Sequence, residues 1–241
     1  AHRPKTRSDS ERHHAPRVAN DVAEFLESRR GDNQPFYAQV GFFETHTPYD
    51  FGFCKPDEEN GVWIPPYAKA HGWPSWAQTL SRFNRNTDFA RRHVAEFQGS
   101  LQQADEAVGK ILAALEENGL DEHTLVLYNT DHGPELPGAK WTMYDGGLGI
   151  AFIMRWPAGG VRGGRRCDWL LGNVDFLATL YDLIGLQQPE DLQGVSFARA
   201  CREDVTDEAS PRNVVFGNWV DGLNFSARTS QFKLIRNLVP V

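Results

Sequence analysis

The feature that constrains the fold most is a long amphipathic pattern that leads into a short apolar run. Between residues 88 and 119, apolar side chains recur three and four positions apart, at Val94, Phe97, Leu101, Ala104, Val108, Ile111 and Leu115. This spacing predicts one long helix, which Asp88 can cap and Asn118-Gly119 ends. The apolar run at residues 124–128 predicts a buried strand. We therefore expect a helix that docks on a sheet, and not a coiled coil.

Helix and strand patterns alternate along most of the chain. The clearest further patterns are two helices and two strands, at residues 15–30, 175–185, 35–43 and 150–156, respectively. Short strand-like pieces follow near the carboxyl end. This order predicts an α/β fold with a largely parallel sheet flanked by helices in residues 1–186, and a small antiparallel sheet in residues 187–241.

Composition excludes several classes of protein. The 241 residues carry a net charge of −7, which argues against general nucleic-acid binding. No apolar run approaches the ~20 residues of a membrane span, and no signal peptide is visible. Cys54, Cys167 and Cys201 form no C-x-x-C pair, so they indicate neither a zinc site nor a disulfide framework. The chain begins at Ala1 with a polar stretch, which suggests a cut or a mature end.

Polar side chains follow two of the predicted strands. Asp131 and His132 come after residues 124–128, His46 comes after residues 35–43, and Lys140 lies a few positions further on. Ligands of open α/β sheets bind beyond the carboxyl ends of strands, so we expect these side chains to converge. A carboxylate, two imidazoles and an ammonium group can hold a cation and an anion together. Taken singly, each residue also fits turn capping or a solvated surface position.

Five segments, in order, resemble the sulfatase family of the alkaline-phosphatase-like superfamily. They are FYAQVGFFETHTPY, DEAVGKILAALEENGLDEHTLVLYNTDHG, AKWTMYDGGLGIAFIMRWPAG, GNVDFLATLYDLIGL with LQGVSF, and SARTSQFKLIRN. The resemblance implies an alkaline-phosphatase-like sandwich and a sulfuric ester hydrolase. It also implies roles for single residues. Asp131 and His132 would bind a divalent metal, normally Ca²⁺ with Mg²⁺ as the alternative, and the catalytic residues Lys140 and His46 would bind the sulfate.

The nucleophile of that family is absent from this sequence. The family makes a formylglycine from the first residue of a Cys- or Ser-x-Pro-x-Arg motif, and the stretch Cys54-Lys-Pro-Asp-Glu58 ends in Glu instead of Arg. Asp145 also stands where the family more often has Glu. We therefore expect a middle-to-C-terminal fragment, with the formylglycine and a pair of acidic ligands in an earlier part. Such a fragment alone should be inactive and poorly stable, because its sheet has an uncovered edge.

Two other functions fit the same residues. Sulfate and phosphate are both tetrahedral oxyanions, so a phosphonate or phosphate ester hydrolase is one alternative, and a non-catalytic anion-binding relative is another. The expected partner is a sulfated small molecule or glycan, without nucleic acid or a membrane span. Four aromatic residues between residues 50 and 86 could form a stacking wall for a sugar or aryl group: Trp63, Tyr67, Trp73 and Trp76. The resemblance favours a periplasmic, secreted or lysosomal location.

Overall fold

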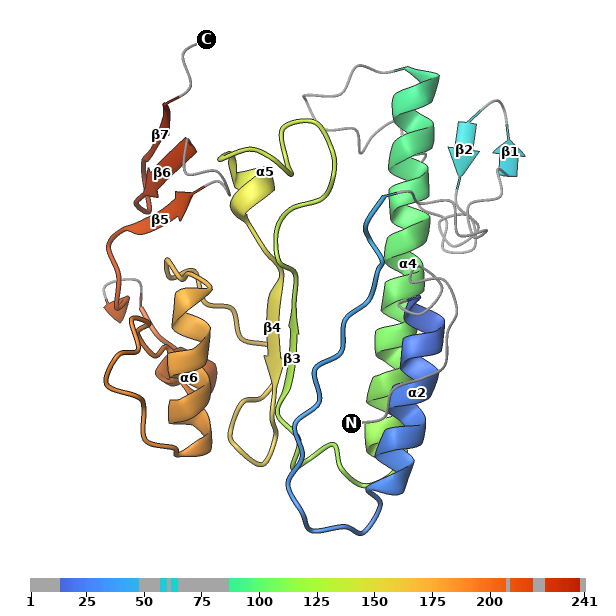
Figure 1. Cartoon of the computed structure of the whole chain (residues 1–241), viewed down its shortest axis with the longest axis vertical. Coiled ribbons are helices and arrows are strands. Elements are labelled where there is room, and N and C mark those ends of the chain that lie inside the picture. The colour runs from blue at the N-terminus through green and yellow to red at the C-terminus, as the bar shows by residue number, and fades with distance from the viewer. Residues whose placement is uncertain are drawn as a thin grey trace. The chain divides into compact units, whose positions relative to one another are not determined.

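A computed structural model describes residues 14–47, 57–59, 62–64, 87–206, 209–218 and 224–238. The chain divides into two compact units, Ala1–Asp121 and Glu122–Val241 (Figure 1). The division that we expected, at residue 186, remains a prediction.

The first unit is built on a pair of helices, α2 (Ala15–Ser28) and α4 (Asp88–Glu117). They pack through small side chains, with Phe42 and Ile111 against the cluster formed by Ala15, Ala19 and Ala107. The predicted long helix is confirmed, but its cap is Thr87, whose hydroxyl accepts a hydrogen bond from the backbone of Ala90 at 3.2 Å. A two-stranded antiparallel sheet, β1 (Asp57–Glu59) and β2 (Val62–Ile64), belongs to the same unit.

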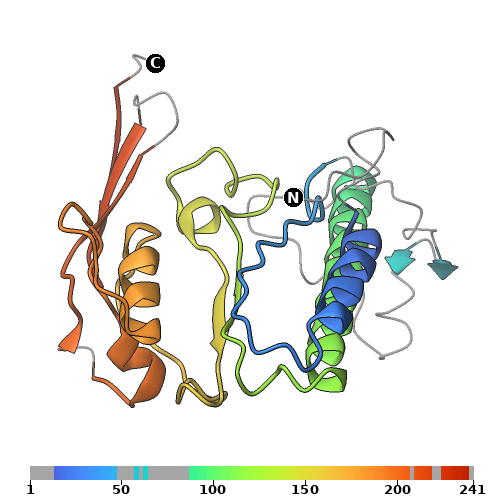
Figure 2. The same ribbon diagram turned by 60° about the horizontal axis from the view of Figure 1, so that its bottom comes forward.

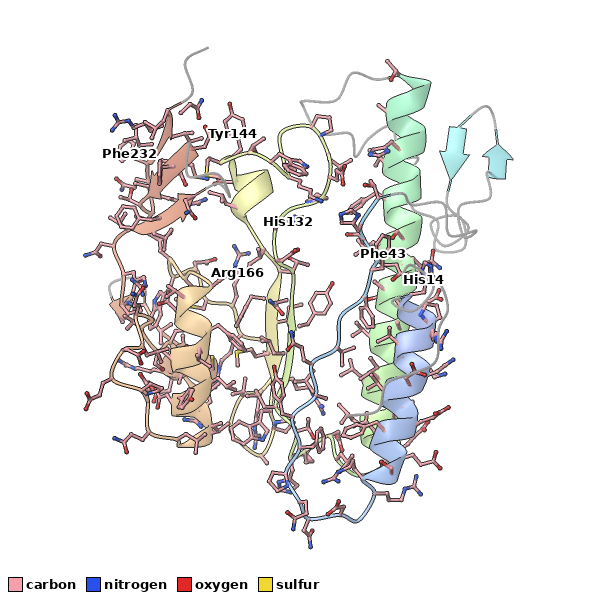
Figure 3. All side chains as sticks on the ribbon, in the orientation of Figure 1. His14, Phe43, His132, Tyr144, Arg166 and Phe232 are labelled. Carbon is pink, nitrogen blue, oxygen red and sulfur yellow. The ribbon has the colours of Figure 1, made fainter. Side chains whose placement is uncertain are left out.

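The prediction of a buried strand at residues 35–43 was wrong. The segment pairs with no strand among the residues that the structure describes, and the side chain of Tyr37 is 79% exposed. Its aromatic residues instead pack on helices, as Phe36 does against Phe25 with 5.5 Å between ring centroids. Glu44 ends the segment, and its buried carboxylate accepts hydrogen bonds from His14 and from the first backbone N–H of α2. Figure 3 shows His14 beside Phe43 at this point.

The second unit contains an antiparallel strand pair, β3 (Val126–Asn129) and β4 (Phe152–Arg155), in which Val126 faces Arg155. All strand pairs in the described parts of the chain are antiparallel, so the largely parallel sheet is not formed by these residues. A parallel pair needs a long crossover, usually a helix. The connection from β3 to β4 contains α5 (Asp145–Leu148), a single turn of helix, and the chain returns antiparallel.

Helices cover one face of this strand pair. α6 (Val174–Ile184) and α7 (Ala198–Arg202) contribute Leu183 and Ala198 to a core that includes Met154 of β4. Figures 1 and 2 both show α6 running alongside β4. At the start of β4, the ring of Phe152 lies 5.5 Å from that of Phe197.

The carboxyl end forms the small antiparallel sheet that the sequence predicts. Its strands are β5 (Val215–Asn218), β6 (Asn224–Arg228) and β7 (Lys233–Asn237), hydrogen-bonded in that order. Within the described ranges, no helix has both the length and the apolar character that a membrane crossing requires.

Candidate functional site

The site begins where β3 ends. The backbone N–H of Thr130 donates to the carbonyl oxygen of Ala151 at 3.2 Å, and the hydroxyl of Thr130 accepts from the backbone of Ala151 at 3.1 Å. These bonds extend the strand pair by one residue on each side. The next two residues, Asp131 and His132, therefore follow directly on the hydrogen-bonded end of the strand pair.

Gly133 follows this pair because two backbones pass very close to each other. Its N–H donates to the carbonyl oxygen of Gly147 at 3.0 Å. A β-carbon on Gly133 would lie 1.7 Å from the carbonyl oxygen of Gly146, a distance that no side chain tolerates. The Asp-His-Gly motif at residues 131–133 and the Asp-Gly-Gly motif at residues 145–147 therefore pack against each other through their glycines.

A ring nitrogen of His132 lies near a carboxylate oxygen of Asp131. The Nδ1 atom of His132 lies 2.8 Å from the carbonyl oxygen of Gly133. Because a carbonyl only accepts, this contact assigns a proton to Nδ1, which leaves Nε2 as the nitrogen that a neutral ring presents to a metal. The Nε2 atom lies 3.5 Å from Oδ2 of Asp131, whose side chain is 86% exposed. Two ligand atoms at this spacing fit a shared cation. No group of three or more His, Cys, Asp or Glu residues is placed to hold a metal in the described part of the chain.

Lys140 lies in the loop between β3 and α5. Its backbone N–H donates to the carbonyl oxygen of Pro134 at 2.9 Å, which folds the loop back on itself. The side chain is only 13% exposed, and its ammonium group lies 3.4 Å from a carboxylate oxygen of Glu135. The same group lies 5.4 Å from the ring centroid of Trp141. Sequence reasoning found Lys140 but missed Glu135 and Trp141, which no local pattern marks as site residues.

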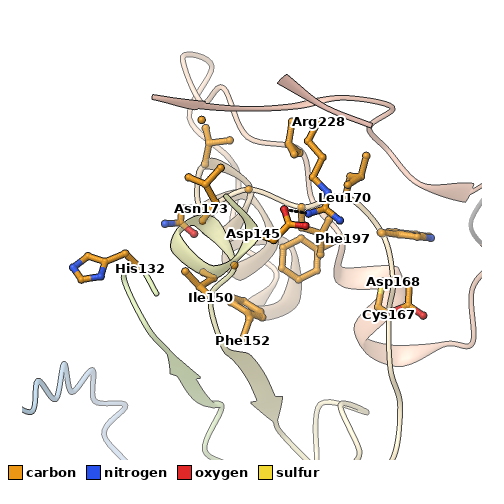
Figure 4. A pocket seen from close by; sticks show the side chains of 18 of the residues that line it. His132, Asp145, Ile150, Phe152, Cys167, Asp168, Leu170, Asn173, Phe197 and Arg228 are labelled. Carbon is orange, nitrogen blue, oxygen red and sulfur yellow. Dashed lines mark hydrogen bonds and ion pairs between the residues drawn. The ribbon is translucent and has the colours of Figure 1, made fainter. Parts of the chain in front are cut away.

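Asp131, His132 and Lys140 line one cavity of about 1170 Å³ within the second unit. Figure 4 shows its wall, with His132 on the turn that follows β3. Its lining includes six cationic side chains and three carboxylates among the described residues: Lys140, Arg162, Arg165, Arg166, Arg228 and Lys233 against Asp131, Asp145 and Asp168. Glu135 and Asp204 pair with Lys140 and Arg165 from outside this lining, so the excess of positive charge in the cavity is small. It favours an anionic ligand although the chain is acidic.

The C-terminal sheet holds the loop of Lys140 in place. Asp145, the first residue of α5, forms ion pairs with Arg228 of β6 and Lys233 of β7, and the pair with Arg228 is drawn in Figure 4. The hydrogen bond from Lys233 is the main reason that the pKa of Asp145 is lowered. Lys233 also donates to the carbonyl oxygen of Met143 at 3.1 Å. The sequence showed the strands that carry these cations but not the contact itself.

His46 belongs to the first unit. Its Nδ1 atom lies 2.7 Å from the carbonyl oxygen of Thr47, and its ring lies 5.3 Å from that of Phe43. This contact again assigns the proton to Nδ1, as in His132. The convergence of His46 with the three residues of the second unit stays a prediction. Of the expected aromatic wall, Trp63 lies in β2, and Tyr67, Trp73 and Trp76 lie outside the described residues.

Comparison with known proteins identifies the family. The family described as Sulfatase matches residues 3–186, three quarters of the chain. The chain belongs to the sulfatase family. A second sulfatase model, described as N-sulphoglucosamine sulphohydrolase, C-terminal, matches residues 139–239. Sulfatases of this family generally use a metal ion and a formylglycine.

Three similar proteins each cover most of this chain. An ulvan-active sulfatase of Formosa agariphila is 27% identical over 234 residues, which is 88% of this chain and 39% of that protein. A 4S-sulf structure from the glycosaminoglycan metabolism of Bacteroides thetaiotaomicron has a TM-score of 0.67 at 22% identity, and covers 90% of this chain and 48% of the other. A phosphonate monoester hydrolase from Silicibacter pomeroyi has a TM-score of 0.64 at 20% identity, with coverages of 94% and 53%. These likenesses confirm the alkaline-phosphatase-like α/β fold, and the chain spans about half or less of each relative.

Proposed function

We propose that this sulfatase hydrolyses sulfate esters and that its substrate is a sulfated sugar. The observation that carries the proposal is that Asp131, His132 and Lys140 line one cavity together with several arginine and lysine side chains. The family membership supports the reaction class. The activity of the ulvan-active relative and the glycosaminoglycan context of the structural relative support a sugar as the substrate class.

Each residue has a separate task in this proposal. Lys140 donates to the sulfate oxygens from a mostly buried position, where an ammonium group stabilises negative charge more strongly than in water. His46 donates from Nε2 to the leaving oxygen, which requires a ring protonated on both nitrogens because Nδ1 is bound to the carbonyl oxygen of Thr47. Asp131 and His132 hold a divalent cation, which when bound polarises the sulfate. The nucleophile of the family is a formylglycine, which none of these 241 residues supplies.

For the cation we propose Ca²⁺, with Mg²⁺ as the alternative, on the resemblance to the family. Nε2 of His132 and Oδ2 of Asp131, 3.5 Å apart, would be two of its ligands.

A second candidate function is the hydrolysis of phosphonate or phosphate esters. The structural likeness to the phosphonate monoester hydrolase favours it, and a tetrahedral phosphonate would meet the same Lys140. A non-catalytic anion-binding protein is the third candidate, because the nucleophile motif does not occur in this sequence. For the compartment, we propose the periplasm, the lysosome or the exterior of the cell, on the resemblance to the family.

Initial rates on matched esters test the proposal. The complete gene product is assayed with 4-nitrophenyl sulfate and with the corresponding phosphate and phenylphosphonate esters. We expect a higher kcat/KM for the sulfate ester, and Lys140→Met should lower kcat by about 10²–10³. Lys110→Met is the matched control, because Lys110 is an exposed lysine on α4. Preference for a phosphorus ester, or equal rates in Lys140→Met and the wild type, would contradict the proposal.

A further inference from the structure

Trp141 occupies a turn position that suits glycine. The backbone N–H of Thr142 donates to the carbonyl oxygen of Ala139 at 3.1 Å, and this bond closes a four-residue turn. The third residue of the turn is Trp141, whose φ is +72°. Glycine adopts this left-handed conformation freely, whereas a bulky L side chain is strained in it. Among the described residues, no other non-glycine residue has a positive φ.

Burial of the indole ring does not offset this strain, because the ring is largely exposed. The residue is 64% exposed, and it lines the same cavity as Lys140, its neighbour in the turn. The ring centroid lies 5.4 Å from the ammonium group of Lys140. Strained residues of this kind concentrate at functional sites, because there the conformation serves a ligand.

We propose that Trp141 is the platform on which the sugar ring of a sulfated substrate stacks while Lys140 holds its sulfate. The inference rests on the proposed function and adds a specificity residue to it. A sugar ring has an apolar C–H face, which suits an exposed indole ring, and a sulfate on its edge reaches a cation beside that ring. The turn places Lys140 and Trp141 at adjacent positions of one bend of the chain.

The test separates sugar binding from sulfate binding. For the complete gene product, KM is measured for sulfated disaccharides prepared from ulvan and from glycosaminoglycans, and Ki is measured for inorganic sulfate as a competitive inhibitor. Trp141→Gly should raise KM for the disaccharide that the wild type prefers by about three- to tenfold, with the Ki of sulfate unchanged. Trp141→Phe should keep a KM near that of the wild type.

Two further variants serve as controls. One tests whether misfolding explains the change in KM, and the other tests whether the loss of any exposed aromatic side chain has the same effect. Trp141→Leu keeps an apolar side chain at the same backbone position but has no ring face. It should therefore raise the KM for the disaccharide as Trp141→Gly does, and it replaces Trp141→Gly in the test if that variant folds poorly. Phe232→Ala is the matched control, since Phe232 is 75% exposed and lies outside the cavity lining (Figure 3). Its KM should not change.

Other results of these measurements would overturn either the stacking platform or the proposed function. An unchanged KM in Trp141→Gly and Trp141→Leu would overturn the stacking platform and leave the proposed function intact. An equal loss of disaccharide and inorganic sulfate binding would overturn the platform as well, because Trp141 would then merely position Lys140. Hydrolysis of none of the disaccharides by the wild type would overturn the proposed function itself.

Discussion

The ammonium group of Lys233 donates a hydrogen bond to the carbonyl oxygen of Met143 at 3.1 Å, across 90 residues of chain. The same group binds the carboxylate of Asp145. One cation of the last strand thus fixes the end of the loop that carries Lys140 and the beginning of α5. The C-terminal sheet is therefore a support for the site.

Loss of this support should destabilise the second unit. Lys233→Met removes a charged hydrogen bond from a mostly buried side chain, and we expect it to lower the free energy of unfolding by about 1–2 kcal/mol. Urea-induced unfolding measures this. Lys233→Arg keeps the charge and should recover most of the loss. An unchanged unfolding midpoint in Lys233→Met would show that Lys233 does not stabilise the loop that carries Lys140.

The close approach at Gly133 predicts a severe effect of a single methyl group. Gly133→Ala places a β-carbon against the carbonyl oxygen of Gly146, so backbone must shift, and we expect a loss of at least about 2–3 kcal/mol. Gly109→Ala in helix α4 is the control, because outside the adjacent helix backbone no atom lies within 4 Å of its added β-carbon. There the change should stabilise the helix by up to about 1 kcal/mol. Similar thermal midpoints for the two variants would rule out the contact.

Asp175 predicts a dependence of stability on pH. Burial alone raises the pKa of this carboxyl, but hydrogen bonds from Arg212 and from the backbone N–H groups of Val195 and Gly172 outweigh burial and lower the pKa below its ordinary value of 3.8. A carboxyl with a lowered pKa stabilises the folded state above its unfolded pKa and loses that contribution as the pH falls through the folded pKa.

The matched variant isolates this contribution. Asp175→Asn should be less stable than the wild type by a constant amount at neutral pH, and of the order of 3 kcal/mol is expected because Arg212 loses its buried partner. The difference should shrink as the pH falls below 3.8. Urea unfolding at a series of pH values measures it. A difference that stays constant down to the acid limit would show that the carboxylate charge contributes nothing.

The two proposed metal ligands predict a loss of calcium affinity. Asp131→Ala and His132→Ala in the complete gene product should each weaken Ca²⁺ binding by at least about tenfold, since each removes a direct ligand. Isothermal titration measures the affinity. Asp168→Asn is the control, because Asp168 lines the same cavity but pairs with Arg166 at 2.8 Å. Equal affinity in Asp131→Ala and the wild type would place the metal elsewhere.

The elements that sequence predicts well are those with local signals. The helix expected at residues 88–119 is α4, Asp88–Glu117, because its periodicity and its glycine stop lie within the segment. The prediction of a strand at residues 35–43 was wrong. A strand requires a hydrogen-bonded neighbour, and the local sequence does not show whether one is present. Its aromatic residues suit a helix surface as well as a sheet.

The residues of the candidate site also differ in whether a local sequence signal marks them. Asp131, His132 and Lys140 were predictable because a strand end and a known motif mark them, and they line one cavity. Trp141 was missed because its left-handed φ arises from the fold of the loop around it. Lys233 was missed because its contacts with Met143 and Asp145 join parts of the chain about 90 residues apart. The glycines at positions 133, 146 and 147 were a signal of close backbone contact that the sequence did contain.

We propose that Asp131, His132, Lys140 and His46 meet around one cation and one sulfate. A crystal structure of the complete gene product grown with calcium and sulfate measures this directly. We predict one sulfate within hydrogen-bonding distance of both Nζ of Lys140 and the imidazole of His46, and one calcium ion bound to Asp131 and Nε2 of His132. A structure in which His46 lies apart from the sulfate held by Lys140, or in which calcium binds without Asp131 and His132, would contradict the account.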